Sequence, residues 1–274
     1  MTLVRSSLVV LALALAAPRA SAGTLVVMQR SEAGATAKPP AVTRIHLEAD
    51  RARLETSGPQ ASVMIFRKDR DLVWLIDEHE GRYVEMTPET MAEVGAETER
   101  QLAQARRRRE EALAKAPPEQ RAMMEKMMAQ NPAGHPAAGA ATASITYEKV
   151  ASDTVRGRRC DRYQGTRDGA KVVELCVAEP ASLDVPAAHA AVMRELADFY
   201  RRSTAKLGAV MGTPVQAGRD LPPGLPIRRV EYRDGTAAER EEVVEIRAEA
   251  FAPTLFELPS GLRKDDSWAT RTPR

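Results

Sequence analysis

The stretch CDRYQGTRDGAKVVELC, residues 160–176, decides the fold because it predicts a β-hairpin closed by a disulfide. We expect a three-residue loop at Arg167–Gly169, whose glycine supplies the left-handed backbone that such turns need. In this register Cys160 lies directly opposite Cys176. These are the only two cysteines of the chain, and an oxidising compartment would join them in a structural disulfide. Closing a loop of this length contributes about 3 kcal/mol in the chain-entropy model.

The same register predicts which side chains pair across the hairpin. It creates an ion pair and an aromatic/β-branched pair, both of which stabilise neighbouring antiparallel strands. The pairs are Arg162 with Glu174 and Tyr163 with Val173. One apolar face then comprises Tyr163, Val173, Leu175 and Val177. The cysteines are expected on the opposite face.

Short apolar runs with partial alternation predict an antiparallel meander before this hairpin. The runs cover residues 24–29, 42–48, 51–55 and 61–67, followed by a second hairpin with strands at 72–76 and 83–86. Its loop, His79–Gly81, also ends on glycine, so that Trp74 is expected opposite Met86 and Ile76 opposite Val84. Two hairpins built alike indicate one continuous sheet.

A helical insertion at residues 88–144 is expected between the two halves of this sheet. Thr87-Pro88-Glu89 is typical of a helix start, and helical sequence extends to about residue 114 and again, after Pro117-Pro118, to residue 130. Residues 131–144 are rich in Ala, Gly and Pro and predict a flexible connector.

The remaining elements complete the predicted fold. Further strands are expected at 145–150, 227–233 and 242–250, and a helix at 186–207 has apolar residues at helical spacing. The predicted fold class is α+β, with an antiparallel sheet curled into an open half-barrel, covering helices and the helical insertion. We expect one domain at residues 23–262 and a polar tail at 263–274.

The first 22 residues predict export. Arg5 precedes the unbroken apolar run Leu8–Ala17, and Ala20–Ala22 has the small-x-small form of a secretory cleavage site. The run of about ten residues is shorter than the roughly 20 that a transmembrane helix needs. We therefore expect residues 1–22 to be a signal peptide, no transmembrane segment, and a periplasmic or secreted protein.

The charge balance argues against a polyanionic partner. The chain has 40 Lys and Arg against 38 Asp and Glu, and loss of Arg5 and Arg19 with the signal peptide leaves 38 bases against 38 acids. Nucleic acid is therefore not an expected partner. The run Arg106–Arg109, followed by two glutamates, is more typical of a solvated helix face.

No motif predicts catalysis, a metal or a cofactor. The four histidines, His46, His79, His135 and His189, show no zinc-ligand spacing. A Gly-x-Ser-x-Gly motif and a glycine-rich phosphate loop are both absent. We expect a non-enzymatic protein without a cofactor.

Four methionines form one soft apolar face of the predicted insertion. They are Met123, Met124, Met127 and Met128. Packing onto the body or a partner helix is the first interpretation, and an adaptable contact for a lipid or a protein partner is the second. Cu(I) binding by the thioethers, with His135 nearby, is the third, because soft sulfur selects that ion.

The order of features resembles a family of exported bacterial proteins of unknown function that share the fold of the outer-membrane lipoprotein carriers, the LolA/LolB-like half-barrels. The motifs that carry the resemblance are 64–67 and 74–77, Tyr83-Val84-Glu85-Met86, 160–163 with 174–176, Gly212-Thr213-Pro214-Val215, and 256–262. The resemblance implies a curled antiparallel sheet with helices at its mouth and an apolar concave surface able to hold acyl chains. The long insertion and the mid-chain disulfide depart from the carriers, and no carrier residue is transferred.

These observations predict a periplasmic protein that binds a hydrophobic ligand, a lipid or a lipidated partner, on the inner face of the sheet. The residues expected to line this face are Trp74, Ile76, Val84, Tyr163, Val173 and Leu175. Ordinary packing in the core is the competing interpretation for each of them. The alternative function is an envelope scaffold that recruits a protein partner through the methionine-containing insertion.

Overall fold

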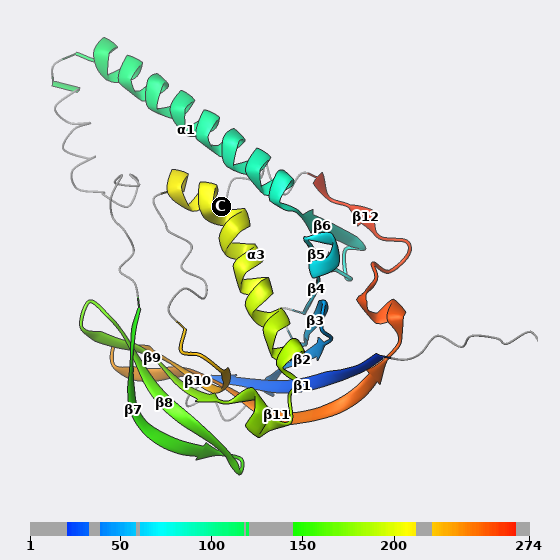
Figure 1. The fold of residues 1–274 in the computed structure, drawn as a ribbon. Helices are drawn as coiled ribbons and strands as arrows, with labels where there is room; N and C mark the ends of the chain where they lie inside the picture. The colour runs from blue at the N-terminus through cyan, green and yellow to red at the C-terminus, as the bar shows by residue number, and fades with distance from the viewer. Residues whose placement is uncertain are drawn as a thin grey trace, which may run out of the picture.

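A computed structural model describes residues 21–32, 39–58, 61–117, 119–120, 145–211 and 221–266. These residues form one mostly antiparallel sheet of 12 strands and two long helices (Figure 1). The strand order is β12-β6-β5-β4-β3-β2-β1-β11-β10-β9-β8-β7, with β12 and β7 at the two open edges. An open antiparallel sheet with helices, as predicted, is confirmed.

The first six strands form the expected meander, each antiparallel to the next. They are β1 (Ser21–Glu32), β2 (Ala41–Leu47), β3 (Arg51–Thr56), β4 (Ser62–Arg67), β5 (Leu72–Asp77) and β6 (Arg82–Met86). A 3-10 turn, η1 (Lys68–Arg70), connects β4 to β5.

The second half of the sheet follows the insertion. Its strands are β7 (Thr146–Val155), β8 (Arg158–Arg167), β9 (Ala170–Ala178), β10 (Leu225–Arg233) and β11 (Thr236–Phe251). Strand β11 pairs with β10 on one side and with the whole of β1 on the other, so it joins the two halves into one sheet. The short β12 (Arg263–Lys264) pairs with β6 in parallel.

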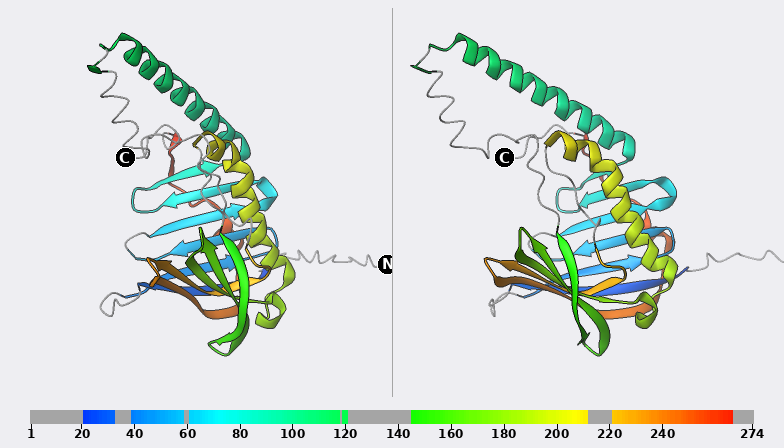
Figure 2. Two further views of the ribbon diagram at one scale, coloured as in Figure 1. Left: turned by 90° about the vertical axis from the view of Figure 1, so that its left-hand side faces the viewer. Right: turned by 60° about the vertical axis from the view of Figure 1, so that its left-hand side comes forward.

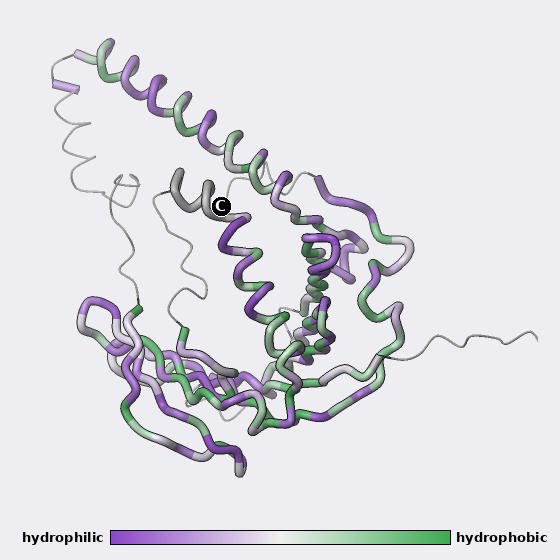
Figure 3. The backbone as a smooth tube through the Cα atoms, in the orientation of Figure 1, coloured by the Kyte–Doolittle hydropathy of each residue, from purple (hydrophilic) through white to green (hydrophobic). Residues whose placement is uncertain are grey.

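Helix α1 (Pro88–Lys115) begins where the sequence predicts. The Thr87 hydroxyl accepts a hydrogen bond from the Thr90 amide at 3.2 Å, and the Thr90 hydroxyl accepts one from the Thr87 amide at 2.9 Å, which satisfies two amides at the helix start. Only Met91, Val94 and Gly95 of this helix are buried. Its far half therefore projects from the body as a largely hydrophilic arm (Figure 3).

Helix α3 (Ala187–Met211) crosses the concave side of the sheet (Figure 2). Val192, Leu196 and Phe199 are buried against the sheet. The ring centroids of Phe199 and Phe66 are 5.8 Å apart. This face of the sheet and α3 form the main core, which also contains Cys160 and Cys176.

The outer face of the first sheet half is also buried. A second cluster there contains Trp74 and Ile76 and is completed by Phe256 of the 3-10 turn η4 (Pro253–Phe256). The Arg53 guanidinium donates a hydrogen bond to the Leu255 carbonyl at 3.2 Å, which holds this segment in place. Both faces of β1–β5 therefore carry apolar residues.

The disulfide between Cys160 and Cys176 is confirmed, with the two Cα atoms 5.4 Å apart. The predicted three-residue loop is wrong, because Arg167 pairs with Ala170 and leaves a two-residue turn. Asp168 and Gly169 form this turn with φ of 51° and 77°. Left-handed values at both positions are those of the type I′ turn that Asp-Gly favours.

The register of this hairpin also differs from the prediction. A bulge leaves Val172 without a partner, and the strands then place Arg162 opposite Cys176 and Tyr163 opposite Leu175. The cysteines face the main core, whereas Tyr163 packs with Val173 and Leu175 in a third, separate cluster. The face expected to line the interior therefore lies on the other side of the sheet.

The second hairpin is shifted by one residue. Its loop has four residues, so Trp74 lies opposite Glu85 and Ile76 opposite Tyr83. The Trp74 indole donates a hydrogen bond to the Glu85 carboxylate at 3.0 Å. Because a shift of one residue reverses the face of every side chain, Val84 lies on the inner face, away from Trp74 and Ile76.

Reduction of the disulfide should lower the free energy of unfolding by about 3 kcal/mol, because the hairpin loop is then no longer closed in the unfolded chain. The measurement is urea unfolding followed by circular dichroism, with and without dithiothreitol. The double variant Cys160→Ser/Cys176→Ser is the control, since it should unfold like the reduced protein and ignore the reductant. Identical midpoints for the oxidised and reduced protein would contradict the prediction.

Candidate functional site

An apolar cavity of about 430 Å³ lies between α3 and the sheet, where the two sheet halves meet. Its walls come from β1, β2, β10, β11, α3 and the segment before β10. The lining residues are Val26, Met28, Ile45, Leu47, Leu183, Ala190, Met193, Arg194, Ala197, Asp198, 221–227, Val243 and Ile246. Apart from Arg194 and Asp198, none of these side chains is charged or hydrogen-bonding.

The sheet wall of the cavity follows from strand alternation. In β1, Val26 and Met28 face α3, whereas Leu25 and Val27 face the outer cluster. The pairing of β1 with β11 changes register between Val27 and Met28, which leaves Val244 as the extra residue of a bulge. Bulges bend a strand and increase its twist. The sheet therefore bends at the cavity.

The helical wall is made of small and flexible side chains. Ala190, Met193 and Ala197 are spaced by three and four positions, so they lie on one face of α3. The bulkier Val192 and Phe199 point to the main core. The space between helix and sheet is thus filled beside Val192 and Phe199 and left open beside the smaller side chains.

A turn between α3 and β10 forms the third wall. Leu221 is 50% exposed at the cavity mouth and is followed by two prolines. Gly224 has φ of +125°, and a Cβ atom there would lie 2.7 Å from the Ala178 carbonyl oxygen. Only glycine fits this position.

The start of α3 is fixed to the sheet by a buried hydrogen bond. His189 Nδ1 and the Thr24 hydroxyl are 2.9 Å apart. Burial lowers the pKa of His189 and outweighs the attraction of the nearby Glu48 carboxylate. Further along the helix, Lys68 pairs with Glu195 at 3.0 Å. These contacts hold α3 at a fixed distance above the cavity.

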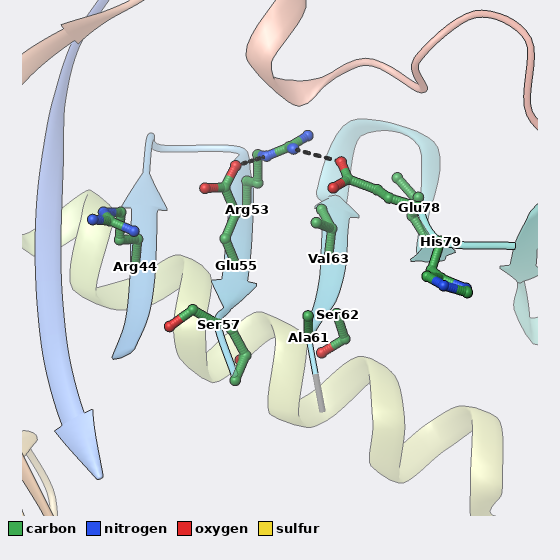
Figure 4. Close-up of a pocket in the computed structure, with 11 residues that line it drawn as sticks. Arg44, Arg53, Glu55, Ser57, Ala61, Ser62, Val63, Glu78 and His79 are labelled. Atoms are coloured by element: carbon green, nitrogen blue, oxygen red, sulfur yellow. Dashed lines mark hydrogen bonds and ion pairs between the residues drawn. The ribbon is translucent and has the colours of Figure 1, made fainter. Parts of the chain in front are cut away.

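A second, polar pocket of about 340 Å³ lies beside the strands β2–β5 (Figure 4). Figure 4 shows Arg53 between Glu55 and Glu78, with nitrogen–oxygen distances of 2.5 Å and 4.0 Å. Because Arg53 also binds the Leu255 carbonyl, its charge is engaged in holding the fold. Nearby, burial lowers the pKa of His46. The apolar cavity is therefore the better candidate for a ligand site.

The described ranges contain neither a metal-ion cluster nor a membrane-spanning helix. No group of three or more His, Cys, Asp or Glu side chains there could hold a metal ion. No helix in the same part of the chain is long and apolar enough to cross a membrane.

Residues 90–262 match the family model "Domain of unknown function (DUF4412)". The chain belongs to the DUF4412 family. Membership of a family of unknown function, as the sequence resemblance implied, is confirmed. No curated protein matches this DUF4412 chain.

Several solved structures resemble the DUF4412 chain at low identity. An uncharacterized conserved protein from Thermus thermophilus is 10% identical, with a TM-score of 0.43 and 89% of each chain covered. The MucA/MucB complex of Pseudomonas aeruginosa is 8% identical, with a TM-score of 0.37. The match covers 89% of this chain and 58% of that chain. A LolA superfamily protein from Nitrosomonas europaea is 7% identical, with a TM-score of 0.26. The match covers 87% of this chain and 91% of that chain. Likenesses this low carry no functional argument.

The six residues that the sequence suggested for ligand binding do not meet at one site. None of them lines the 430 Å³ cavity. They divide among the three apolar clusters: Val84 packs against the main core, Trp74 and Ile76 are in the outer cluster, and Tyr163, Val173 and Leu175 are in the third. The interpretation as ordinary packing therefore fits their positions better.

The methionine face of the insertion is not part of the described structure. Met123, Met124, Met127, Met128 and His135 lie outside the described residues. Sequence reasoning missed the cavity residues instead. The available signal was the stripe Ala190, Met193 and Ala197, with small and flexible side chains where a packed helix normally has bulky ones.

Acidification should destabilise the DUF4412 protein through His46 and His189. Because the folded-state pKa values of His46 and His189 are lowered, the unfolded chain binds protons more tightly. Their contribution to stability is present above the unfolded pKa of about 6.5 and is lost as the pH falls through the folded values. Urea unfolding at a series of pH values measures this loss.

His189→Gln should make this pH dependence shallower, since it removes one of the two histidines whose pKa is lowered in the folded protein. His79→Gln, in an exposed loop, is the matched control and should leave the slope unchanged. A His189→Gln protein with the slope of the unmodified protein would contradict the assignment.

Proposed function

We propose that this protein binds a hydrophobic ligand outside the cytoplasm, in the cavity beneath α3 on the concave side of a sheet curled as an open half-barrel. The observation that carries the proposal is the 430 Å³ cavity itself, with its almost wholly apolar wall. Its size lies in the range of about 300–1,000 Å³ that is typical of small-molecule sites.

The chemistry of the wall supports binding without catalysis. The lining contains no hydroxyl, thiol or imidazole group, and its one carboxylate, Asp198, is paired with Arg201. Met28 and Met193 lie on opposite walls. Their unbranched side chains adapt to ligands of different shape, which favours an alkyl or acyl chain as the occupant.

Ala197→Phe should block the site, because the new ring would occupy the space between α3 and the sheet. Affinity for neutral alkanols, measured by displacement of a neutral fluorescent dye, should fall at least about tenfold, as expected when two or more methylenes lose their buried position. Ala105→Phe, on the exposed part of α1, is the matched control and should bind normally.

The affinity of the unmodified protein should rise with alkanol length until the cavity is full. Each buried methylene contributes about 0.8 kcal/mol, so two methylenes give about a tenfold change. An affinity independent of chain length, or unaffected by Ala197→Phe, would show that the cavity is not the binding site. Mass spectrometry of an organic extract of the natively purified protein then identifies the natural ligand.

A second candidate function is partner recruitment through the projecting arm. All residues from Ala103 to Ala112 of α1 are exposed, which supports an envelope scaffold. A photo-crosslinking residue at position 108 should then capture one defined protein in intact cells, whereas the same residue at the exposed Lys149 should not. Equal crosslinking from both positions would count against this function.

A further inference from the structure

We infer that the ligand is a single-chain amphiphile with an anionic head, and that Arg194 binds this head at the cavity mouth. The inference rests on the proposed function, because it assigns a chemical class to the occupant of the same cavity. Arg194 is exposed and yet contributes to the cavity lining. It follows Met193 directly and precedes Ala197 by three positions, and both of these neighbours line the wall.

Among the described residues, the charges around the mouth leave one positive charge without a partner. Asp198 also lines the mouth, but its carboxylate is paired with Arg201. Glu195 is paired with Lys68 at 3.0 Å. On α3 between Ala187 and Ser203, where side chains are described, Arg202 pairs with Asp71 at 3.1 Å, and Arg194 has no carboxylate within ion-pair distance.

The position of Arg194 suits an amphiphile better than a fully apolar ligand. A long arginine side chain can lie along an apolar surface while its guanidinium stays in water. An amphiphile whose apolar chain fills the cavity would place its head at the mouth, where the apolar wall meets water. The guanidinium presents a planar set of donors that matches a carboxylate or a phosphate. Carboxylate and phosphate heads both carry a negative charge and the oxygen acceptors that a guanidinium binds, whereas neutral heads carry no charge.

The contact between the head and Arg194 should increase the affinity of the ligand only modestly, because Arg194 is exposed to solvent. Exposed ion pairs contribute at most about 1 kcal/mol, which is about a fivefold change in affinity. We therefore expect dodecanoate to bind about fivefold more tightly than dodecanol at low ionic strength. The preference should shrink at about 0.5 M salt, because screening weakens exposed charge pairs.

The test compares dodecanol, dodecanoate and dodecyl phosphate on the complete protein at a pH of about 8, where the acids are ionised. Arg194→Gln should bind dodecanol normally and lose the preference for both anions. Arg194→Lys should keep part of it. Arg202→Gln, which removes a paired arginine from the same helix, is the matched control and should keep the full preference.

The outcomes separate this inference from the proposed function. If dodecanol binds but the anions bind no better, or if the preference survives Arg194→Gln, the inference is wrong and the apolar site stands. If none of the three ligands binds, the proposed function is wrong and the inference falls with it. A preference for only one of the two anions supports the inference and identifies the head group.

Discussion

The pairing of β1 with β11 is the interaction on which the rest of the structure depends. Strand β1 lies between β2 and β11, so it is the only link between the first and second halves of the described sheet. The pairing extends from Ser21 to Glu32 and brings the first described strand beside β11, one of the last. Near its beginning, a Cβ atom on Gly23 would lie 2.2 Å from the Phe251 ring. Glycine at this position leaves room for the Phe251 ring and for the Leu47 carbonyl oxygen of β2, which would be 2.8 Å from the same Cβ atom.

The cavity is a consequence of how this junction bends. One bulge leaves Val244 unpaired with β1, and another leaves Ile227 unpaired with β9. Both bulges border the cavity wall, which includes Val243 and Ile227. Because bulges bend and twist the strands, the sheet bends at this point. The small side chains Ala190 and Ala197 do not fill the gap, whereas Phe199 fills the space further along the helix.

Local sequence signals were sufficient to predict the helices and strands, but not to predict which side chains lie on which face of the sheet. Strands β1–β11, both helices and the disulfide follow from alternation, capping and cysteine count, whereas the short β12 lies in the stretch expected to be a polar tail. The hairpin registers failed because one residue in a turn decides them: Asp168 adopts a left-handed φ of 51° and shortens the loop. Alternation could not assign Trp74 and Val84 to a face, since both faces of these strands are buried. The cavity depends on a bulge between strands more than 200 residues apart in sequence, which no local pattern encodes.

The energetics of the cavity connect this geometry to ligand binding. The pocket of about 430 Å³ opens to solvent at its mouth, so its apolar lining is left in contact with water, which is unfavourable. Collapse would bury this lining, but the His189–Thr24 hydrogen bond fixes α3 to the sheet and the turn at Gly224 packs closely against Ala178. Water gains few hydrogen bonds from an apolar wall. An apolar chain in the same space restores the missing contacts, so ligand binding and stability of the folded protein rise together.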